Sequence, residues 1–251
     1  MGDAQKRVGL LYPGSSAEDD FAAFENRFDG SLRFPLVQTS VGEDAHREDA
    51  LLDLGSSTRL AEGAAALAAH RPDSVMWACT SGSFVFGWDG ARRQADELGR
   101  CLDRPASSTS IAFVNALHAL GLHRVAVAAS YPEDITAHLV AFLAHGGIEV
   151  TDVSSRGIVT AAEVGRLGRP DVLRLVGSVD LSDADALLVP DTAMHTLRWI
   201  DDLEEAAGKP VLTANQVTVW EGLNLLGPVP RIEDAGSLFL TGPMTETGDH
   251  P

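Results

Sequence analysis

Short, continuous apolar runs alternate along this chain with longer stretches in which apolar residues recur at helical spacing. The runs end in Gly, Pro, Ser or Thr, which is typical of buried parallel strands. We predict strands over 8–12, 36–41, 75–79, 125–129, 148–150, 186–189 and 210–213. We predict helices over 55–70, 91–102, 108–120, 135–144, 171–176 and 217–226, with others beginning near 18 and ending at 204. This alternation predicts an α/β fold built from parallel βαβ units.

The pattern also repeats, because three pairs of stretches correspond in the same order along the chain. The pairs are Tyr12-Pro13 with Tyr131-Pro132, Cys79-Thr80 with Asp191-Thr192, and Thr109-Ser110 with Asn215-Gln216. A duplicated α/β unit explains all three pairs. We therefore expect two pseudo-symmetric, Rossmann-like domains, each with its own parallel sheet.

The domain boundaries follow from the repeat. We expect the first domain in residues 1–112 together with 215–240, and the second in 113–214. The composition turns polar towards the end, so we expect a disordered tail over 241–251. Ligands bind at the carboxyl ends of parallel strands. Two facing domains therefore place Cys79 and Asp191 on opposite walls of one interdomain active-site cleft.

Cys79 is the first candidate for chemistry, because it ends an apolar strand and precedes Thr80-Ser81-Gly82. The amide groups that open a following helix carry partial positive charge and favour a thiolate. We therefore expect a semi-exposed thiol with a lowered pKa, which alkylates faster than Cys101. The structural alternative is a small buried residue in a tight turn between a strand and a helix.

Charge and composition exclude several classes of function. The 251 residues carry a formal net charge of −17, which argues against nucleic acid, because phosphate binding needs clustered Lys and Arg. A small carboxylate can still bind through amides and hydroxyls. Cys79 and Cys101 have no metal-ligand spacing, so we expect no metal. No signal peptide and no bilayer-spanning apolar stretch is visible, so we expect a cytoplasmic protein that does not bind membranes.

Three motifs carry a resemblance to a known family. The run Cys79-Thr80-Ser81-Gly82-Ser83 matches the first-half signature of maleate isomerases. Tyr131-Pro132 is similar to a second-half loop whose tyrosine contacts substrate. The stretch from Gly208 to Trp220 resembles the carboxyl-terminal signature of the same group. From Val8 to Gly227 the chain therefore resembles the aspartate/glutamate racemase superfamily, in the branch of maleate cis–trans isomerase and arylmalonate decarboxylase.

The resemblance implies two pseudo-symmetric domains around a small carboxylate substrate, and catalysis without a metal or an organic cofactor. It also implies that Cys79 is the first of the family's two catalytic cysteines. Asp191 departs from the family, because it stands where the second cysteine is expected. Ser16 departs too, because isomerases usually carry there an asparagine that binds a substrate carboxylate. Decarboxylases of this branch keep the second cysteine and lack the first, so this chain has the reverse arrangement.

The motifs and the strand ends together select the candidate site residues. The catalytic candidates are Cys79 and Asp191. The substrate-binding candidates, which carry hydroxyls, amides or a tight turn, are Pro13, Gly14, Ser15, Ser16, Thr80, Ser81, Tyr131, Thr192 and Asn215.

Most candidates also have a structural alternative. Asp191 is otherwise a helix N-cap, and Asn215 otherwise holds the Cys79 loop. Tyr131 is expected to face the substrate, because a tyrosine before proline at a strand end is seldom fully buried. For His195, a solvated helix position is favoured over a proton donor. Solvated positions are also expected for Glu43, Asp44, Glu48 and Asp49.

Three functions stay open. The favoured one is a cofactor-independent maleate isomerase-like enzyme, in which the Cys79 thiolate adds to the double bond of a small dicarboxylate. The alternative is an arylmalonate decarboxylase-like or Asp/Glu racemase-like enzyme, in which Cys79 protonates an enolate. The third is a non-catalytic binder of small carboxylates. A homodimer or a higher homo-oligomer also stays open.

Overall fold

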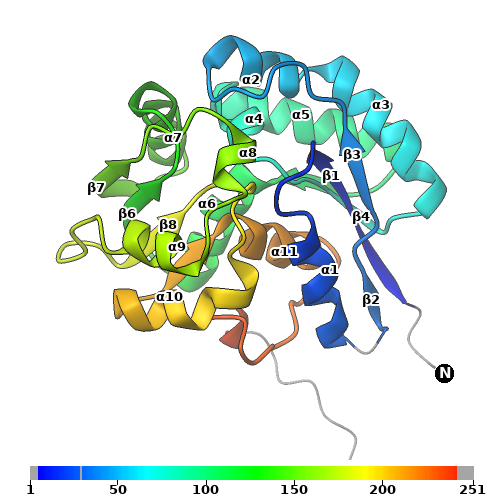
Figure 1. Cartoon of the computed structure of the whole chain (residues 1–251). Coiled ribbons are helices and arrows are strands. Elements are labelled where there is room, and N and C mark those ends of the chain that lie inside the picture. Colours follow the sequence, from blue (N-terminus) through cyan, green and yellow to red (C-terminus); the bar gives the residue numbers. More distant parts are fainter. Residues whose placement is uncertain (1–4, 29, 242–251) are drawn as a thin grey trace, which may run out of the picture.

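The computed structural model describes residues 5–28 and 30–241, and contains two parallel sheets (Figure 1). In the first sheet the order is β2-β1-β4-β5, and β3 also pairs with β1. Its strands are β1 (Lys6–Pro13), β2 (Leu32–Arg33), β3 (Leu36–Thr39), β4 (Ser74–Trp77) and β5 (Ala106–Ser108). The second sheet has the order β7-β6-β8-β9. Its strands are β6 (Arg124–Ala129), β7 (Glu149–Ser155), β8 (Ala186–Val189) and β9 (Val211–Thr213).

Helices connect the successive strands except β2 and β3, and they cover the sheets (Figure 1). In the first half they are α1 (Asp19–Glu25), α2 (Glu48–Leu54), α3 (Ser57–Leu67), α4 (Ser81–Phe84), α5 (Gly87–Leu102) and α6 (Thr109–Leu120). In the second half they are α7 (Glu133–His145), α8 (Ala161–Val164), α9 (Arg169–Val176) and α10 (Ile200–Ala207), and α11 (Ala214–Asn224) follows the last strand. Short 3₁₀ turns are η1 (Asn26–Phe28), η2 (Ala68–His70), η3 (Leu197–Trp199) and η4 (Ser237–Leu240). The predicted α/β class with two parallel sheets is confirmed.

The internal repeat is visible in the hydrogen bonds at the start of equivalent strands. In the first half the backbone N–H of Arg7 donates to Asp73 Oδ2 at 2.8 Å. In the second half the N–H of Arg124 donates to Asp185 Oδ2 at 2.9 Å. Each aspartate precedes the strand that pairs with the arginine's strand, β4 or β8. In the repeat, β1 therefore corresponds to β6, and β4 corresponds to β8.

One core joins the two halves. Helix α11 packs on α6 and also touches strands of both sheets, β1, β4, β5 and β9. Thr109 Oγ1 lies 2.6 Å from Thr218 Oγ1 inside this contact. The largest buried apolar cluster accordingly includes side chains from both sheets, such as Met76 and Leu188. The assignment of 215–240 to the first domain stays a prediction, because α11 contacts both sheets.

Two elements, β5 and α2, do not show the apolar pattern from which the other strands and helices are predicted. Strand β5 consists of Ala106-Ser107-Ser108 and pairs with β4, so its small polar side chains are buried by their neighbours. Helix α2 buries only Ala50 and Leu51, which is too short a stripe to stand out from an acidic segment. Likewise, the helix predicted to end at 204 is divided into a turn, η3 and α10.

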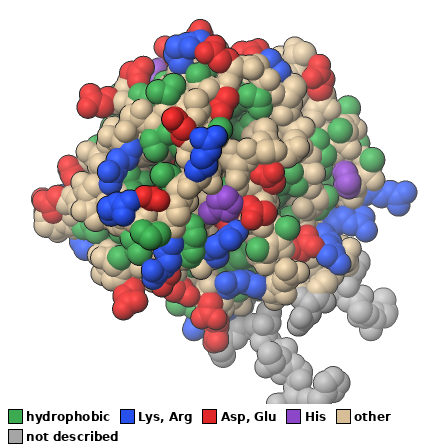
Figure 2. All heavy atoms as spheres, in the orientation of Figure 1, with side chains coloured by type: hydrophobic (Ala, Val, Ile, Leu, Met, Phe, Trp, Pro, Cys, Tyr) green, Lys and Arg blue, Asp and Glu red, His purple; other side chains and the backbone are tan. Residues whose placement is uncertain are grey.

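The surface in Figure 2 carries acidic and basic side chains that are interspersed on the visible face. Among residues 5–28 and 30–241, no helix is long and apolar enough to cross a membrane. Most of the tail predicted over 241–251 lies outside the described residues, of which Thr241 is the last.

Candidate active site

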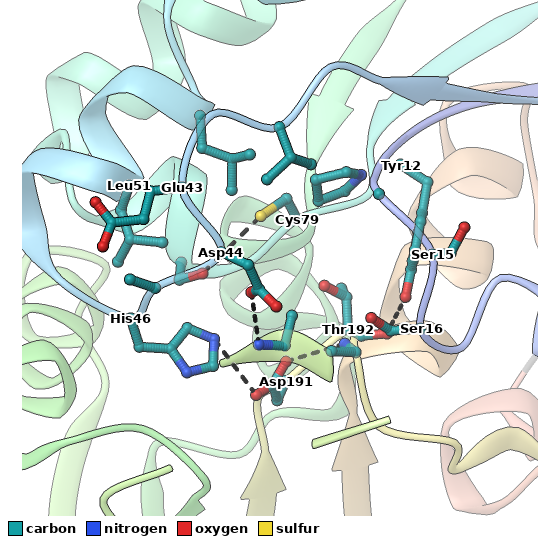
Figure 3. Close-up of a pocket in the computed structure, with 18 residues that line it drawn as sticks. Tyr12, Ser15, Ser16, Glu43, Asp44, His46, Leu51, Cys79, Asp191 and Thr192 are labelled. Carbon is teal, nitrogen blue, oxygen red and sulfur yellow. Dashed lines mark hydrogen bonds and ion pairs between the residues drawn. The ribbon is translucent and has the colours of Figure 1, made fainter. Parts of the chain in front are cut away.

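A cavity of about 200 Å³ lies where the carboxyl ends of β1, β4 and β8 meet (Figure 3). Loops that follow β1, β3 and β4 supply most of its wall, and the second half supplies the turn after β8 and the start of α8. Predicted site residues that line this cavity are Pro13, Gly14, Ser15, Ser16, Cys79, Ser81, Asp191 and Thr192. The duplicated scaffold thus brings Cys79 and Asp191 to one cavity from opposite halves.

Cys79 follows β4 and is held by the turn that leads into α4. Its Sγ accepts a hydrogen bond from the backbone N–H of Gly82 at 3.3 Å. The Ser81 hydroxyl lies 3.9 Å from the same sulfur. The side chain lines the cavity, yet the residue is only 3 % exposed. The sulfur is therefore accessible from the cavity and scarcely from bulk solvent.

The expectation of a semi-exposed thiol with a lowered pKa is wrong. Burial raises the pKa of Cys79 to about 12, and the nearby Asp191 carboxylate adds to the rise. The bonds from Gly82 and Ser81 act in the opposite direction and offset only part of it. Burial disfavours the charged form of any acid. Cys79 is consequently a protonated thiol at neutral pH in the ligand-free protein.

Asp191 follows β8 and is 3 % exposed. Its Oδ1 accepts from the backbone N–H of Ala193 at 2.9 Å, and its Oδ2 accepts from the Ser130 hydroxyl. Residues 191–194 form a turn and not a helix, so the N-cap alternative does not apply. Asp191 thus acts as an acceptor in both bonds. Two protein donors therefore hold this carboxylate in place in the cavity wall.

His46 is a cavity residue that the sequence did not single out. It is 7 % exposed and comes from the loop between β3 and α2. Its Nδ1 lies 2.8 Å from the carbonyl oxygen of Ile158, and its Nε2 lies 4.0 Å from Asp191 Oδ2. The ring also packs edge-on against Tyr131, with centroids 4.9 Å apart. Figure 3 shows the ring turned towards Asp191.

The acidic loop before His46 is exposed, as predicted, and it also reaches the rim of the cavity. Glu43 and Asp44 both line the cavity. Asp44 also accepts from the backbone N–H groups of Ala161 and Ala162, at 2.8 and 3.2 Å, and so ties this loop to α8. Asp44 is exposed, as predicted, and in addition its carboxylate satisfies free amides at the start of a helix.

The loop after β1 lies where the sequence predicts it. Gly14 adopts φ +65°, a left-handed conformation that glycine takes without strain. Ser15 Oγ accepts from Gln38 Nε2 at 2.8 Å, and the backbone N–H of Ser16 donates to Glu18 at 2.7 Å. These hydrogen bonds hold the turn, which lines the cavity from Pro13 to Ser16.

Three predicted substrate contacts do not line the cavity. Tyr131 is only 1 % exposed, and its hydroxyl donates to the Pro190 carbonyl at 2.9 Å, so the substrate-facing expectation is wrong. Thr80 is fully buried beside it. Asn215 donates to Asp20 Oδ2 and to the Met194 carbonyl, both at 3.3 Å. These side chains support the cavity wall from behind.

Tyr12 lies in the cavity instead. Its hydroxyl donates to the Thr192 carbonyl at 2.9 Å and accepts from the Ala17 N–H at 3.0 Å, so it links the two halves. Burial raises its pKa above the ordinary value for tyrosine, although the Ala17 bond opposes this, so the hydroxyl stays protonated.

Two further residues lie away from the cavity. His195 Nε2 is 2.7 Å from Asp19 Oδ1, so the histidine is neither free in solvent nor in reach of the cavity. Cys101 is exposed on α5. Within 5–28 and 30–241, no group of three or more His, Cys, Asp and Glu side chains could hold a metal ion.

Fold and site together define a duplicated parallel α/β protein in which a buried thiol and a buried carboxylate face one cavity. Residues 55–239 match the family model described as arylmalonate decarboxylase, and the chain belongs to this family. The predicted resemblance to the branch of maleate isomerase and arylmalonate decarboxylase is thereby confirmed.

Curated relatives carry both names. A maleate isomerase from Geobacillus stearothermophilus is 32 % identical over 136 residues, and an arylmalonate decarboxylase from Bordetella bronchiseptica is 31 % identical over 125 residues. These matches cover 54 % and 49 % of this chain, and 54 % and 52 % of the relatives. The chain thus spans about half the length of these relatives.

Solved structures match over nearly the whole fold. The maleate isomerase Iso from Pseudomonas putida S16 has a TM-score of 0.85 at 24 % identity, covering 93 % of this chain and 98 % of that one. A mutant of the Nocardia farcinica maleate cis–trans isomerase with a covalently bound succinylcysteine intermediate has the same TM-score, identity and coverage. At this level of identity the likeness establishes the fold.

Proposed function

We propose that this protein is a cofactor-independent isomerase of the maleate isomerase type, which acts on a small unsaturated dicarboxylate through Cys79. One observation carries the proposal: the Cys79 sulfur and the Asp191 carboxylate line the same cavity from opposite halves of the molecule. A nucleophile and a proton-handling group on two sides of one substrate are what addition to a double bond requires.

The proposed reaction has three steps. Cys79 sulfur bonds to one alkene carbon, and the electron pair of the double bond moves to the other carbon, next to a carboxylate. The carbon–carbon bond is then single and rotates. Elimination reforms the double bond and releases the sulfur. Asp191, or a group that Asp191 orients, handles the proton. The succinylcysteine named for the Nocardia relative is an adduct of this kind.

In this proposal, neutral groups bind the substrate carboxylates. Among the described residues that line the cavity there is no Lys or Arg. The turn from Pro13 to Ser16, together with Ser81 and Thr192, supplies hydroxyls and backbone amides there. Such groups bind carboxylates without a full positive charge.

A decarboxylase is the second candidate, and the state of Cys79 favours it. A thiol whose pKa is raised to about 12 is protonated at neutral pH, and can donate its proton to an enolate. A relative named arylmalonate decarboxylase supports this candidate as well. Racemisation is less favoured, because Asp191 and Cys79 are not matched acids and cannot exchange roles with similar ease.

Intact-mass spectrometry with a panel of C4 and C5 dicarboxylates tests the proposal. The isomerase predicts a covalent adduct that is absent in Cys79→Ala, together with trans product detected by NMR. Decarboxylation of phenylmalonate with no adduct would support the second candidate instead. Binding without turnover of any substrate would leave only a carboxylate binder. We also propose a cytoplasmic location, since the free thiol must stay reduced.

A further inference from the structure

The imidazole of His46 is fixed in a way that decides which of its nitrogens can transfer a proton. Nδ1 lies 2.8 Å from the Ile158 carbonyl oxygen. A carbonyl oxygen only accepts hydrogen bonds, so Nδ1 carries a proton in every charge state of the ring. Nε2 is therefore the nitrogen that gains and loses a proton, and it points towards Asp191, on the cavity wall (Figure 3).

Asp191 is poorly suited to donate a proton itself. Each of its oxygens accepts a bond from a protein donor, Ala193 N–H or the Ser130 hydroxyl. Both oxygens are therefore already engaged as acceptors. A carboxylate next to an imidazole orients the ring and balances the charge of the imidazolium, as in catalytic triads.

From this geometry we propose that His46 Nε2 is the acid/base that serves the substrate carbon next to the one attacked by Cys79, and that Asp191 is the positioning residue that holds and balances His46. This assignment rests on the proposed function. The 4.0 Å between Nε2 and Asp191 Oδ2 exceeds a direct hydrogen bond. Catalytic hydrogen bonds are often long without substrate and shorten in the complex.

The protons balance through one cycle. As Cys79 sulfur bonds to one alkene carbon, its proton passes to Nε2, directly or through one water, and the alkene electron pair becomes an enolate. Nε2–H then donates that proton to the enolate carbon, which gives a saturated thioether. After rotation, Nε2 takes a proton from the same carbon, the double bond reforms, the carbon–sulfur bond breaks, and the proton returns to sulfur.

Several titratable groups surround this imidazole and take part in its electrostatics. Tyr131 stacks edge-on against the ring from the loop after β6. The others share the cavity with it, and are Tyr12, Glu43, Asp44, Cys79 and Asp191.

The test compares maleate turnover by the wild type with that of His46→Asn and His46→Ala. The Asn amide can keep a donor near the Ile158 carbonyl but has no Nε2. We expect kcat to fall roughly 10²–10⁴-fold in both variants, with KM within about threefold. Imidazole in the buffer is expected to restore His46→Ala at least about tenfold, and to leave Cys79→Ala inactive. His195→Asn, which removes the other histidine paired with an aspartate, is the matched control and keeps kcat within about threefold of the wild type.

The positioning role of Asp191 is tested separately, by comparing kcat and KM of two Asp191 variants. The kcat lost in Asp191→Asn is expected to return in part in Asp191→Glu, with the same KM in both variants. A His46→Asn enzyme within about threefold of the wild type, or a His46→Ala enzyme that does not respond to imidazole, would overturn the proposal.

A second arm does not depend on any substrate. In a Cys101→Ser background, His46→Gln is expected to slow alkylation of Cys79 by iodoacetamide about tenfold at pH 7.5, because the sulfur loses the base that accepts its proton. Equal rates overturn the role of His46. A wild type that does not isomerise maleate, combined with slowed alkylation, would overturn the proposed function and still support His46 as the base.

Discussion

The loops after β4 and β8 occupy equivalent places in the two halves, yet one presents a thiol and the other a carboxylate. Cys79 is held by the N–H of Gly82, and Asp191 by the N–H of Ala193. Both side chains thus accept a backbone N–H from the segment that follows, three residues on for Cys79 and two residues on for Asp191, whereas the side-chain chemistry differs. A scaffold made by duplication sets where two reactive groups meet, and the residue type at each place decides what they do. Two unlike groups favour a reaction in which each keeps one role.

Removing the Cys79 thiol, the reactive group of the first half, is expected to lower turnover the most. Cys79→Ala deletes the nucleophile, so turnover should fall about 10⁴-fold or more. Steady-state assays with the substrate found by mass spectrometry measure this loss. Cys101→Ser is the control, since Cys101 is exposed and lies outside the cavity. A Cys79→Ala enzyme with more than about a tenth of wild-type activity would remove the thiol from the mechanism.

Replacing the Asp191 carboxylate, the reactive group of the second half, should lower turnover less. Asp191→Asn keeps the shape but loses the charge, and turnover should fall roughly 10²–10⁴-fold while substrate binding stays measurable by calorimetry. Equal rates for the wild type and Asp191→Asn would reduce Asp191 to a turn residue. Rapid interconversion of amino-acid enantiomers by the wild type would contradict the unlike roles of the two ends.

The buried state of Cys79 gives a prediction about pH. Because burial raises its pKa to about 12, the thiolate fraction should rise close to tenfold for each pH unit between 7 and 10, without a plateau. Alkylation of His46→Gln followed by peptide mass spectrometry measures this slope in the ligand-free protein, because in this variant no imidazole at position 46 assists the loss of the thiol proton. In the wild type, Cys101 is exposed and should react first, with turnover intact. A Cys79 rate that levels off below pH 8 would show a lowered pKa and restore the expectation from the sequence.

The smallest expected effect concerns the hydrogen bond that each half makes at its equivalent strand start. Asp185→Ala removes the acceptor for Arg124 N–H and should lower the free energy of unfolding by about 1 kcal/mol at pH 7. These backbone bonds hold the pKa of Asp185 below its ordinary value, so the stabilisation is present above pH 3.8 and is lost as the pH falls through the folded pKa. Urea denaturation at pH 7 and pH 3 measures both values.

Asp73→Ala removes the equivalent acceptor in the first half, at Arg7 N–H, and is the matched comparison. Losses at pH 7 that differ by more than about 1 kcal/mol would show that the two strand starts are not energetically equivalent.

Much of the fold could be predicted because its signals are local. Apolar runs identify strands such as β1, β6 and β8, and the three pairs of corresponding stretches, Tyr-Pro among them, indicate the duplication. The carboxyl ends of parallel strands converge, so Cys79 and Asp191 could be placed in one cavity before any coordinates. Strand β5 could not be found, because its small polar residues are buried by pairing with β4 and not by an apolar pattern.

Burial and partners were decided by the tertiary structure. Nothing next to Tyr131 in sequence indicates that its hydroxyl is covered by Pro190, and the rise in the Cys79 pKa comes from packing around the sulfur. His46 lies in a loop without periodicity, 112 positions from the carbonyl that orients it. The chain by itself therefore determined which groups stand at the strand ends. Only the folded protein decided their protonation and their partners, because both depend on atoms that are distant in sequence and close in space.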